Sequence, residues 1–154
     1  MGMKTPLIIL GAILAFKLLV KQAWGQEVRA VVDVVKANNA EFDYIPDGLI
    51  LAIAKVESNL NPKATGAAGE YGLMQIMPAT WNWIFQRSGI VPPQNPYDPY
   101  YNILGAMMLL DIHYRNLGSW FDVIHAYNVG SGAFANGIRN WAYFQNVLKY
   151  WFIV

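Results

Sequence analysis

Residues 57–80 have the sequence ESNLNPKATGAAGEYGLMQIMPAT. Asn61-Pro62 ends the apolar helical segment before it, because the residue that precedes a proline disfavours helical backbone. Glycine and alanine are frequent in residues 62–77, which predicts an irregular loop with a short helical turn. Pro78 suits the first turn of a helix. We therefore predict two helices joined by a loop whose glycines let the backbone approach a ligand closely.

Helical patterns continue on both sides of this loop. The predicted helices cover residues 26–36, 46–58, 78–85, 99–116, 120–127 and 140–151. Asp98 and Ser119 are expected to cap the fourth and fifth of them, whereas Gly130 and Gly132 predict a turn. Because the sequence has no strand-like alternation and no internal repeat, we predict an all-α fold with functional residues on helix ends and loops.

The composition excludes several classes of function. The chain has 154 residues, enough for one domain, and 55% of them are hydrophobic against 14% charged. Eleven basic and ten acidic residues leave a net charge of +1, which argues against a nucleic-acid partner. Cysteine is absent, so disulfides, thiolate metal sites and cysteine nucleophiles are excluded.

The two histidines do not predict a metal site. His113 and His125 are twelve residues apart and belong to no pattern typical of metal ligands. We expect His113 at the surface and His125 at the edge of a groove. No metal and no cofactor is predicted.

The first 24 residues are strongly apolar and allow three interpretations. As a membrane anchor, the run from Pro6 to Val20 reaches the required length of about 20 residues only if Lys17 extends its charge to the interface. As a signal peptide, it would be cleaved near Ala23-Trp24-Gly25. A buried helix fits least well, because the apolar side chains point all round. We predict an anchor over residues 1–24, or an uncleaved signal, and a folded domain over residues 25–154.

Glu57 lies where the hydrophobic core is expected. Within the helix over residues 46–58, the apolar positions and Glu57 fall in one arc of about 120°. Burial would raise the pKa of this carboxyl group into the range useful for a general acid. Alternatively, the carboxylate lies at the edge of the stripe and bonds to a backbone amide. The adjacent glycine-rich loop, with the donor and acceptor groups of Gln75, favours the acid.

The sequence resembles the lytic transglycosylase domain of the soluble lytic transglycosylase type. Five blocks carry the resemblance, in the order expected for the family: Glu57-Ser58-x-x-Asn61-Pro62, Gly69-x-x-Gly72-Leu73-Met74-Gln75-Ile76-Met77-Pro78-Ala79-Thr80, Asp98-Pro99-x-x-Asn102-Ile103-x-Gly105, Ala126-Tyr127-Asn128-x-Gly130 and Tyr143-Phe144-x-x-Val147. They cover roughly residues 45 to 150.

The resemblance implies a lysozyme-like helical fold and cleavage of the β-1,4 bond between N-acetylmuramic acid and N-acetylglucosamine in peptidoglycan. Glu57 matches the single catalytic acid of the family. The acetamido group of the substrate would assist, and the C6 hydroxyl of the muramic acid would close a 1,6-anhydro ring. In agreement, no second carboxylate is obviously placed for a two-carboxylate glycosidase. We expect Glu70 to be a solvated loop charge and Asp98 a helix cap.

The resemblance also implies a set of substrate-binding residues: Gln75, Met77, Tyr127, Asn128, Tyr143 and Thr65. Gln75 and Met77 match groove-lining positions, and Tyr127 matches a tyrosine near the acid and the acetamido group. Asn128 belongs to the same turn, and Tyr143 matches a tyrosine whose hydroxyl approaches the acid. Many members have a serine where this chain has Gly66, and Thr65 could replace that hydroxyl.

These features predict a membrane-anchored lytic transglycosylase that acts locally on glycan strands. Its setting is either the bacterial envelope, with the domain in the periplasm or outside, or the membrane of a phage virion during entry, with assembly partners in either case. The alternatives are a lysozyme-type hydrolase of the same fold and a non-catalytic protein that binds the cell wall. The closing residues 150–154 are expected at the bilayer interface near Trp24 or docked on the core.

Overall fold

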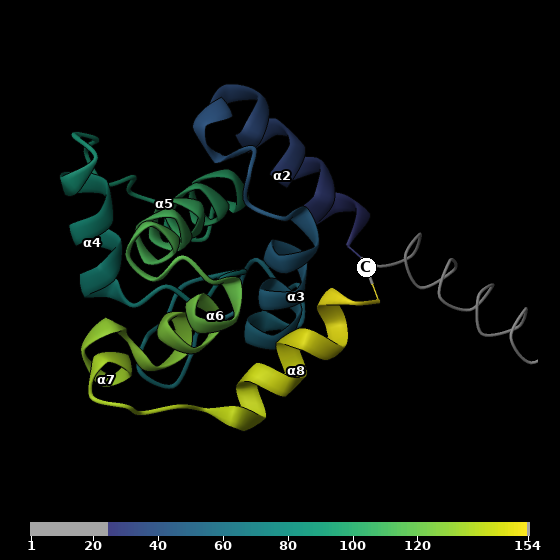
Figure 1. Cartoon of the computed structure of the whole chain (residues 1–154). Coiled ribbons are helices and arrows are strands. Elements are labelled where there is room, and N and C mark those ends of the chain that lie inside the picture. The colour runs from purple at the N-terminus through teal and green to yellow at the C-terminus, as the bar shows by residue number, and fades with distance from the viewer. Residues whose placement is uncertain (1–24, 154) are drawn as a thin grey trace, which may run out of the picture.

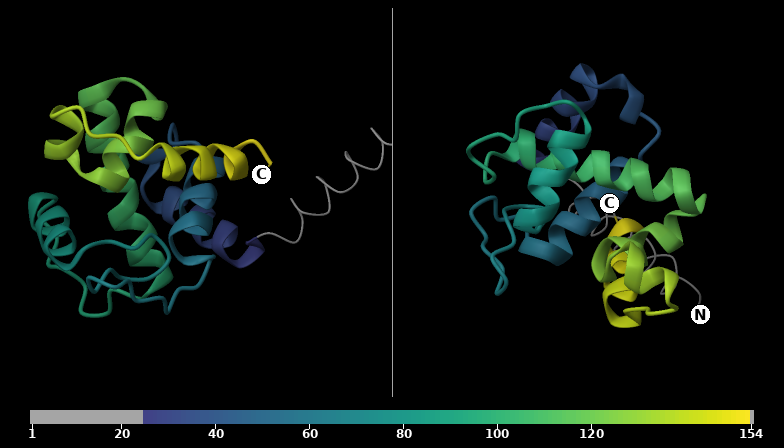
Figure 2. Two further views of the ribbon diagram at one scale, coloured as in Figure 1. Left: turned by 90° about the horizontal axis from the view of Figure 1, so that it is seen from below. Right: turned by 90° about the vertical axis from the view of Figure 1, so that its left-hand side faces the viewer.

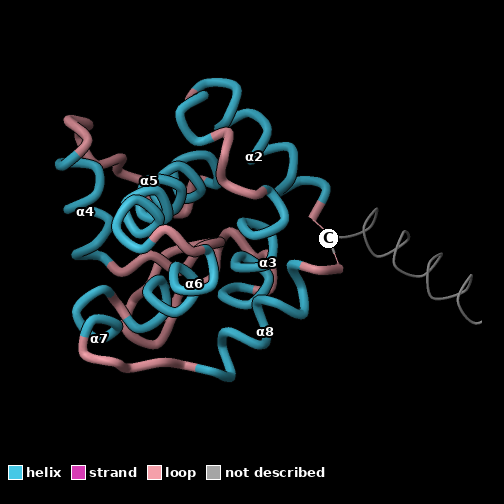
Figure 3. Tube along the Cα trace, in the orientation of Figure 1, coloured by secondary structure: helices cyan, strands magenta, loops and turns pink. Residues whose placement is uncertain are grey.

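The computed structural model describes residues 25–153 (Figures 1 and 3). Within that range it contains the helices α2 (Gln26–Asn38), η1 (Ala40–Phe42), α3 (Asp47–Ser58), α4 (Pro78–Arg87), α5 (Pro99–Leu117), α6 (Trp120–Val129), α7 (Ser131–Ala135) and α8 (Trp141–Trp151). Its β-structure is limited to two isolated bridges, which pair Tyr71 with Thr65 and with Ile76. The prediction of an all-α fold is confirmed for the described residues.

The capping residues end the helices close to where the sequence predicts. The Asp98 carboxylate accepts from the backbone N–H groups of Tyr100 and Tyr101, and the Ser119 hydroxyl accepts from that of Asp122. Such contacts satisfy donors that have no partner within the helix. The sequence missed the two shortest helices, η1 and α7. The turn predicted at Gly130 and Gly132 is the start of α7, whose single turn is too short to show periodicity.

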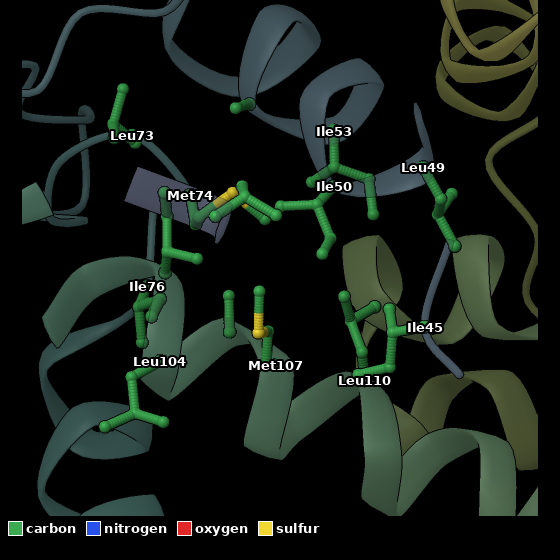
Figure 4. Packing of buried hydrophobic residues seen from close by; sticks show 14 of the residues in the cluster. Ile45, Leu49, Ile50, Ile53, Leu73, Met74, Ile76, Leu104, Met107 and Leu110 are labelled. Atoms are coloured by element: carbon green, nitrogen blue, oxygen red, sulfur yellow. The ribbon is translucent and has the colours of Figure 1, made fainter. Parts of the chain in front are cut away.

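Helix α5 lies in the middle of the molecule (Figure 1). It packs against α2, α4 and α6, and α3 packs mainly against α8 and also against α2. Figure 4 shows Ile50 and Ile53 of α3 facing Met107 and Leu110 of α5. The site is therefore built on a helix, α3, that is held from two sides.

The loop between α3 and α4 is fixed by one buried side chain. Asn102 of α5 has no exposed surface. Its Oδ1 accepts from Met74 N–H at 2.8 Å, and its Nδ2 donates to the carbonyl oxygens of Tyr71 and Pro96, each at 2.9 Å. Gly72 is required beside it, because its φ is 67° and a Cβ there would lie 2.8 Å from Asn102 Nδ2. One amide thus holds the loop against α5.

Both expectations for the histidines are wrong. His113 is only 5% exposed, because it lies in register with the buried positions Ala106 and Leu110 of α5. His125 is 3% exposed, and its ring stacks on Phe144 at 4.4 Å between centroids. Each histidine belongs to the buried face of its helix.

The end of the chain divides into a docked and an exposed part. Trp151 packs on α3, where a Cβ at Gly48 would lie 3.1 Å from its ring. Phe152 is 72% exposed and stacks on Trp151. The end of α8 lies on the same side of the molecule as the start of α2 (Figures 1 and 2).

The predicted anchor over residues 1–24 lies outside the described residues. Among the helices of residues 25–153, none has both the length and the hydrophobicity that crossing a bilayer requires.

Candidate active site

Glu57 is held in a largely apolar environment at the end of α3. The helix buries six consecutive residues, from Leu49 to Ala54, and Glu57 follows one turn after them. Asn59 ends the helix in the left-handed conformation, and the Ser58 hydroxyl donates to the Ala54 carbonyl at 3.0 Å. Burial raises the pKa of Glu57 to about 7, with a smaller contribution in the same direction from the charge of Glu70. The carboxyl group is therefore partly protonated at neutral pH.

Two tyrosines surround this acid. Tyr143 of α8 is 8% exposed, and its hydroxyl donates to Glu57 Oε1 at 2.7 Å. This bond favours the charged carboxylate and so opposes the effect of burial. The hydroxyl of Tyr127 donates to the Met74 carbonyl oxygen at 2.8 Å. Burial, with the nearby charge of Glu57, raises the pKa of both phenols well above 10, so both stay protonated donors.

Gln75 is held in a strained and well-defined orientation. Its φ is 48°, the left-handed region, which costs a non-glycine residue about 1–2 kcal/mol. The side-chain amide donates to the carbonyl oxygens of Gly72 at 2.8 Å and Ala64 at 3.2 Å. With its nitrogen thus engaged, Gln75 presents Oε1 beside Gly66, where it can accept from a ligand.

Glu70 differs from its expected role as a solvated loop charge. It is only half-exposed, and its Oε2 accepts from Ala68 N–H at 2.9 Å. Its charge acts on Glu57, which places it within the same site. The sequence suggests a solvated charge because Glu70 follows three small residues. Only the folded loop turns its side chain back over Gly66.

A pocket of about 340 Å³ joins three of the predicted substrate-binding residues. Met77, Tyr127 and Asn128 line it together with Trp83 and His113. The side chain of Asn128 is held by Asn140, the N-cap residue of α8. Asn140 Nδ2 donates to Asn128 Oδ1 at 2.9 Å. The pocket lies next to the acid, because Tyr127 lines the pocket and is also close enough to Glu57 for the charge of Glu57 to raise the pKa of its phenol.

Thr65, another predicted contact, pairs with a residue outside the predicted set, and a second pocket lies elsewhere on the surface. The hydroxyl of Thr65 pairs with that of Tyr97 at 2.8 Å. A second pocket, of about 350 Å³, contains none of the predicted site residues and is lined by Arg87, Asp111 and Arg115 among others. Over residues 25–153, no group of three or more His, Cys, Asp and Glu side chains is arranged to hold a metal ion.

Most of the chain matches a known protein family. The Transglycosylase SLT domain model matches residues 35–146. The chain belongs to this family. All the predicted site residues lie within the SLT domain, from Glu57 to Tyr143.

Relatives of the SLT domain occur in phage and in bacteria. The chain is 31% identical over 117 residues to a transglycosylase of Enterobacteria phage PRD1, covering 76% of this chain and 41% of that protein. It is 36% identical over 101 residues to the soluble lytic murein transglycosylase of Escherichia coli K12, covering 63% of this chain and 15% of that protein. The chain therefore spans less than half the length of either relative.

Solved structures share the fold. The lytic transglycosylase Slt of Pseudomonas aeruginosa, solved as an inactive mutant, superposes with a TM-score of 0.70 at 26% identity, over 86% of this chain and 24% of that chain. For the 70 kDa soluble lytic transglycosylase of Escherichia coli the TM-score is 0.61 at 28% identity, over 79% of this chain and 21% of that one. The lysozyme-like, mostly helical SLT fold is thereby confirmed.

Two residues of this SLT domain gain a clearer role from the structure than from the sequence, which places Trp83 either in helix packing or in a wall of the sugar groove. Asn102 was part of a quoted motif but had no assigned role, and only its three bonds across the fold reveal one. Trp83 is 45% exposed and lines the pocket, whereas Trp81 and Phe85 are buried. The exposed ring follows from the helical period, because position 83 lies opposite Phe85 and Trp81 on α4.

Proposed function

We propose that residues 25–154 form a peptidoglycan lytic transglycosylase domain that cleaves the β-1,4 bond between N-acetylmuramic acid and N-acetylglucosamine. The observation that carries the proposal is the half-buried carboxyl group of Glu57, whose pKa is about 7 and whose Oε1 accepts a bond from Tyr143. A group with this pKa can donate a proton and then accept one at neutral pH. The names of the relatives support the substrate.

In the proposed reaction Glu57 acts twice. First, its proton passes to the glycosidic oxygen while the C1–O bond breaks and the acetamido carbonyl oxygen bonds to C1. Second, the Glu57 carboxylate takes the proton of the C6 hydroxyl, whose oxygen bonds to C1 as the acetamido oxygen leaves. Water is not consumed, and the product ends in a 1,6-anhydro ring. Gln75, Met77, Tyr127, Asn128, Tyr143 and Thr65 are the proposed substrate contacts.

The decisive experiment is Glu57→Gln, assayed on purified sacculi by mass spectrometry of the released muropeptides. We expect release of 1,6-anhydro products to be abolished while the circular dichroism spectrum is unchanged. Asp33→Asn, an exposed carboxylate of α2, is the matched control and should release products as the wild type does. Equal release by Glu57→Gln would contradict the proposal. Products heavier by one water would identify a hydrolase instead.

We also propose that residues 1–24 anchor the enzyme in a membrane, with lipid as its partner. The apolar sequence of this segment supports the anchor, and exposed aromatic side chains on the described domain support contact with a bilayer. Trp141, Phe121 and Phe152 are 61%, 51% and 72% exposed, and aromatic rings favour the membrane interface. Recovering the protein from membranes and sequencing its N-terminus tests this, and an N-terminus at Gln26 would contradict it.

The proposed setting is local opening of the cell wall, either by an envelope machine or during phage entry. The phage relative supports the virion, and relatives named membrane-bound lytic murein transglycosylase C support the envelope. Detection of the protein in purified virions, as opposed to host membranes, separates the two settings.

A further inference from the structure

Glu70 fills the space beside Gly66 that the side chain of any other residue would occupy. A Cβ built on Gly66 would lie 2.0 Å from Glu70 Oε2 and 2.6 Å from its Cδ. The same Cβ would lie 2.7 Å from Gln75 Oε1. Two acceptor oxygens, one of them charged, therefore lie together over the backbone of Gly66.

The loop fixes this carboxylate in place. Gly66 N–H donates to the backbone carbonyl oxygen of Glu70 at 3.0 Å, which closes the turn. Ala68 N–H donates to Oε2 at 2.9 Å. Among residues 25–153, Oε1 has no hydrogen-bond partner of its own. A carboxylate held by one oxygen leaves the other able to accept a bond from a ligand.

The charge of this carboxylate also reaches the acid. Its negative charge acts on Glu57, although charges in water are strongly screened. Glu70 therefore belongs to the same partly desolvated site as Glu57 and Gln75.

We propose that Glu70 accepts a hydrogen bond from the N–H of the 2-acetamido group on the sugar whose bond is cleaved. This inference rests on the proposed function. The acetamido group is attached to C2, next to the C1 atom at which Glu57 acts, and Glu70 and Gln75 hold their acceptor oxygens together over Gly66 in the same loop.

The contact would stabilise the transition state more than the bound substrate. When the acetamido carbonyl oxygen bonds to C1 and the C1–O bond breaks, positive charge develops on the acetamido carbon and nitrogen. A carboxylate that accepts the N–H is attracted most strongly by this charged form. The proton stays on nitrogen, and no atom is transferred to Glu70.

This role explains why position 66 is glycine. A side chain at position 66 would displace the Glu70 carboxylate. The Thr65 hydroxyl is already paired with Tyr97. Glu70 therefore supplies the charged group beside Gly66.

The first test is Glu70→Gln in the full chain, assayed on soluble glycan strands. Glutamine can still accept from Ala68 N–H but carries no charge. We expect kcat to fall about 10- to 100-fold, the loss of a charged hydrogen bond, while KM changes less than about threefold. The alkaline limb of kcat/KM should move to lower pH, because removing the charge lowers the pKa of Glu57.

Two controls keep this test specific. Asp33→Asn removes an exposed carboxylate from α2 and should change neither kcat nor the limb. Glu57→Gln is assayed in parallel, and activity in that variant would overturn the proposed function as a whole. Wild-type kcat and an unmoved limb in Glu70→Gln, with Glu57→Gln inactive, would overturn the role of Glu70 alone.

A double-variant cycle separates the catalytic role from a merely structural one. Gly66→Ser should displace Glu70 and lose activity, and Glu70→Ala should lose it by removing the acceptor. Because Gly66 does not have a positive φ, serine suits the backbone once Glu70 is truncated. We expect the combination of Gly66→Ser with Glu70→Ala to be more active than either single variant. Losses that simply add would overturn the proposal.

Discussion

The Tyr143 hydroxyl donates to Glu57 Oε1 across 2.7 Å, although 86 positions separate the two residues in the sequence. The bond joins α8 to the end of α3, the helix against which α8 packs. It stabilises the ionised carboxylate, whereas burial and the charge of Glu70 stabilise the protonated acid. Because burial is the larger effect, the acid is balanced near neutral pH.

Replacing Glu57 with glutamine should stabilise the fold at high pH. The pKa of Glu57 rises from 4.5 to about 7 on folding, so the folded state binds more protons between these values and stability falls as pH rises through them. At pH 8 the ionised group costs on the order of 3 kcal/mol. Thermal unfolding should therefore show Glu57→Gln gaining over wild type at pH 8 and little at pH 4. A gain that does not depend on pH would contradict this account.

Tyr143→Phe should raise the pKa of Glu57 further. The substitution removes the hydroxyl that donates to the carboxylate and thus favours its charged form. We expect the alkaline limb of the kcat/KM profile to move to higher pH, the opposite direction from Glu70→Gln. Tyr127→Phe is the matched control, since that hydroxyl donates to Met74 rather than to the acid. A limb that moves equally in both variants would show that Tyr143 has no specific effect.

Asn102→Ala should unfold the loop before it unfolds the domain. The change leaves the Met74 N–H and the Pro96 carbonyl without their partner, while the Tyr71 carbonyl keeps only the bond from Ile76 N–H. We expect a loss of about 3–5 kcal/mol in urea unfolding, since each buried unpaired group costs about 1–3 kcal/mol. Asn82→Ala, an exposed asparagine of α4, should cost little. Unchanged hydrogen exchange at Met74 in Asn102→Ala would contradict the role assigned to this amide.

His125→Phe should stabilise the protein, most of all in acid. The His125 ring is buried against Phe144, and its Nδ1 has no hydrogen-bond partner among the described residues. Burial lowers the pKa of His125 below 6.5, so wild-type stability falls as pH decreases through 6.5. A phenylalanine keeps the stack and should gain about 1 kcal/mol at pH 7. A melting-temperature gain that shrinks between pH 7 and pH 5 would contradict this prediction.

Local patterns were sufficient for the six longer helices of residues 25–153 and for the raised pKa of Glu57. The positions of Asp98 and Ser119 as caps follow from hydrogen bonds within a few residues, and the burial of Glu57 follows from its place on an apolar face. The exposure of His113 and His125 was predicted wrongly. Both lie on helices with few polar positions, where the sequence does not indicate which side meets another helix.

The amino-acid sequence alone determined the six longer helices of the described residues and the raised pKa of Glu57, because these properties depend largely on neighbours within one or two turns. It did not determine what surrounds that acid. The Tyr143 bond, the Asn102 anchor and the turn of Glu70 over Gly66 join residues on different elements or turn a side chain back across a loop. Only the packing of α3 against α8 and α2 brings them together, and that packing sets the pKa on which the proposed chemistry depends.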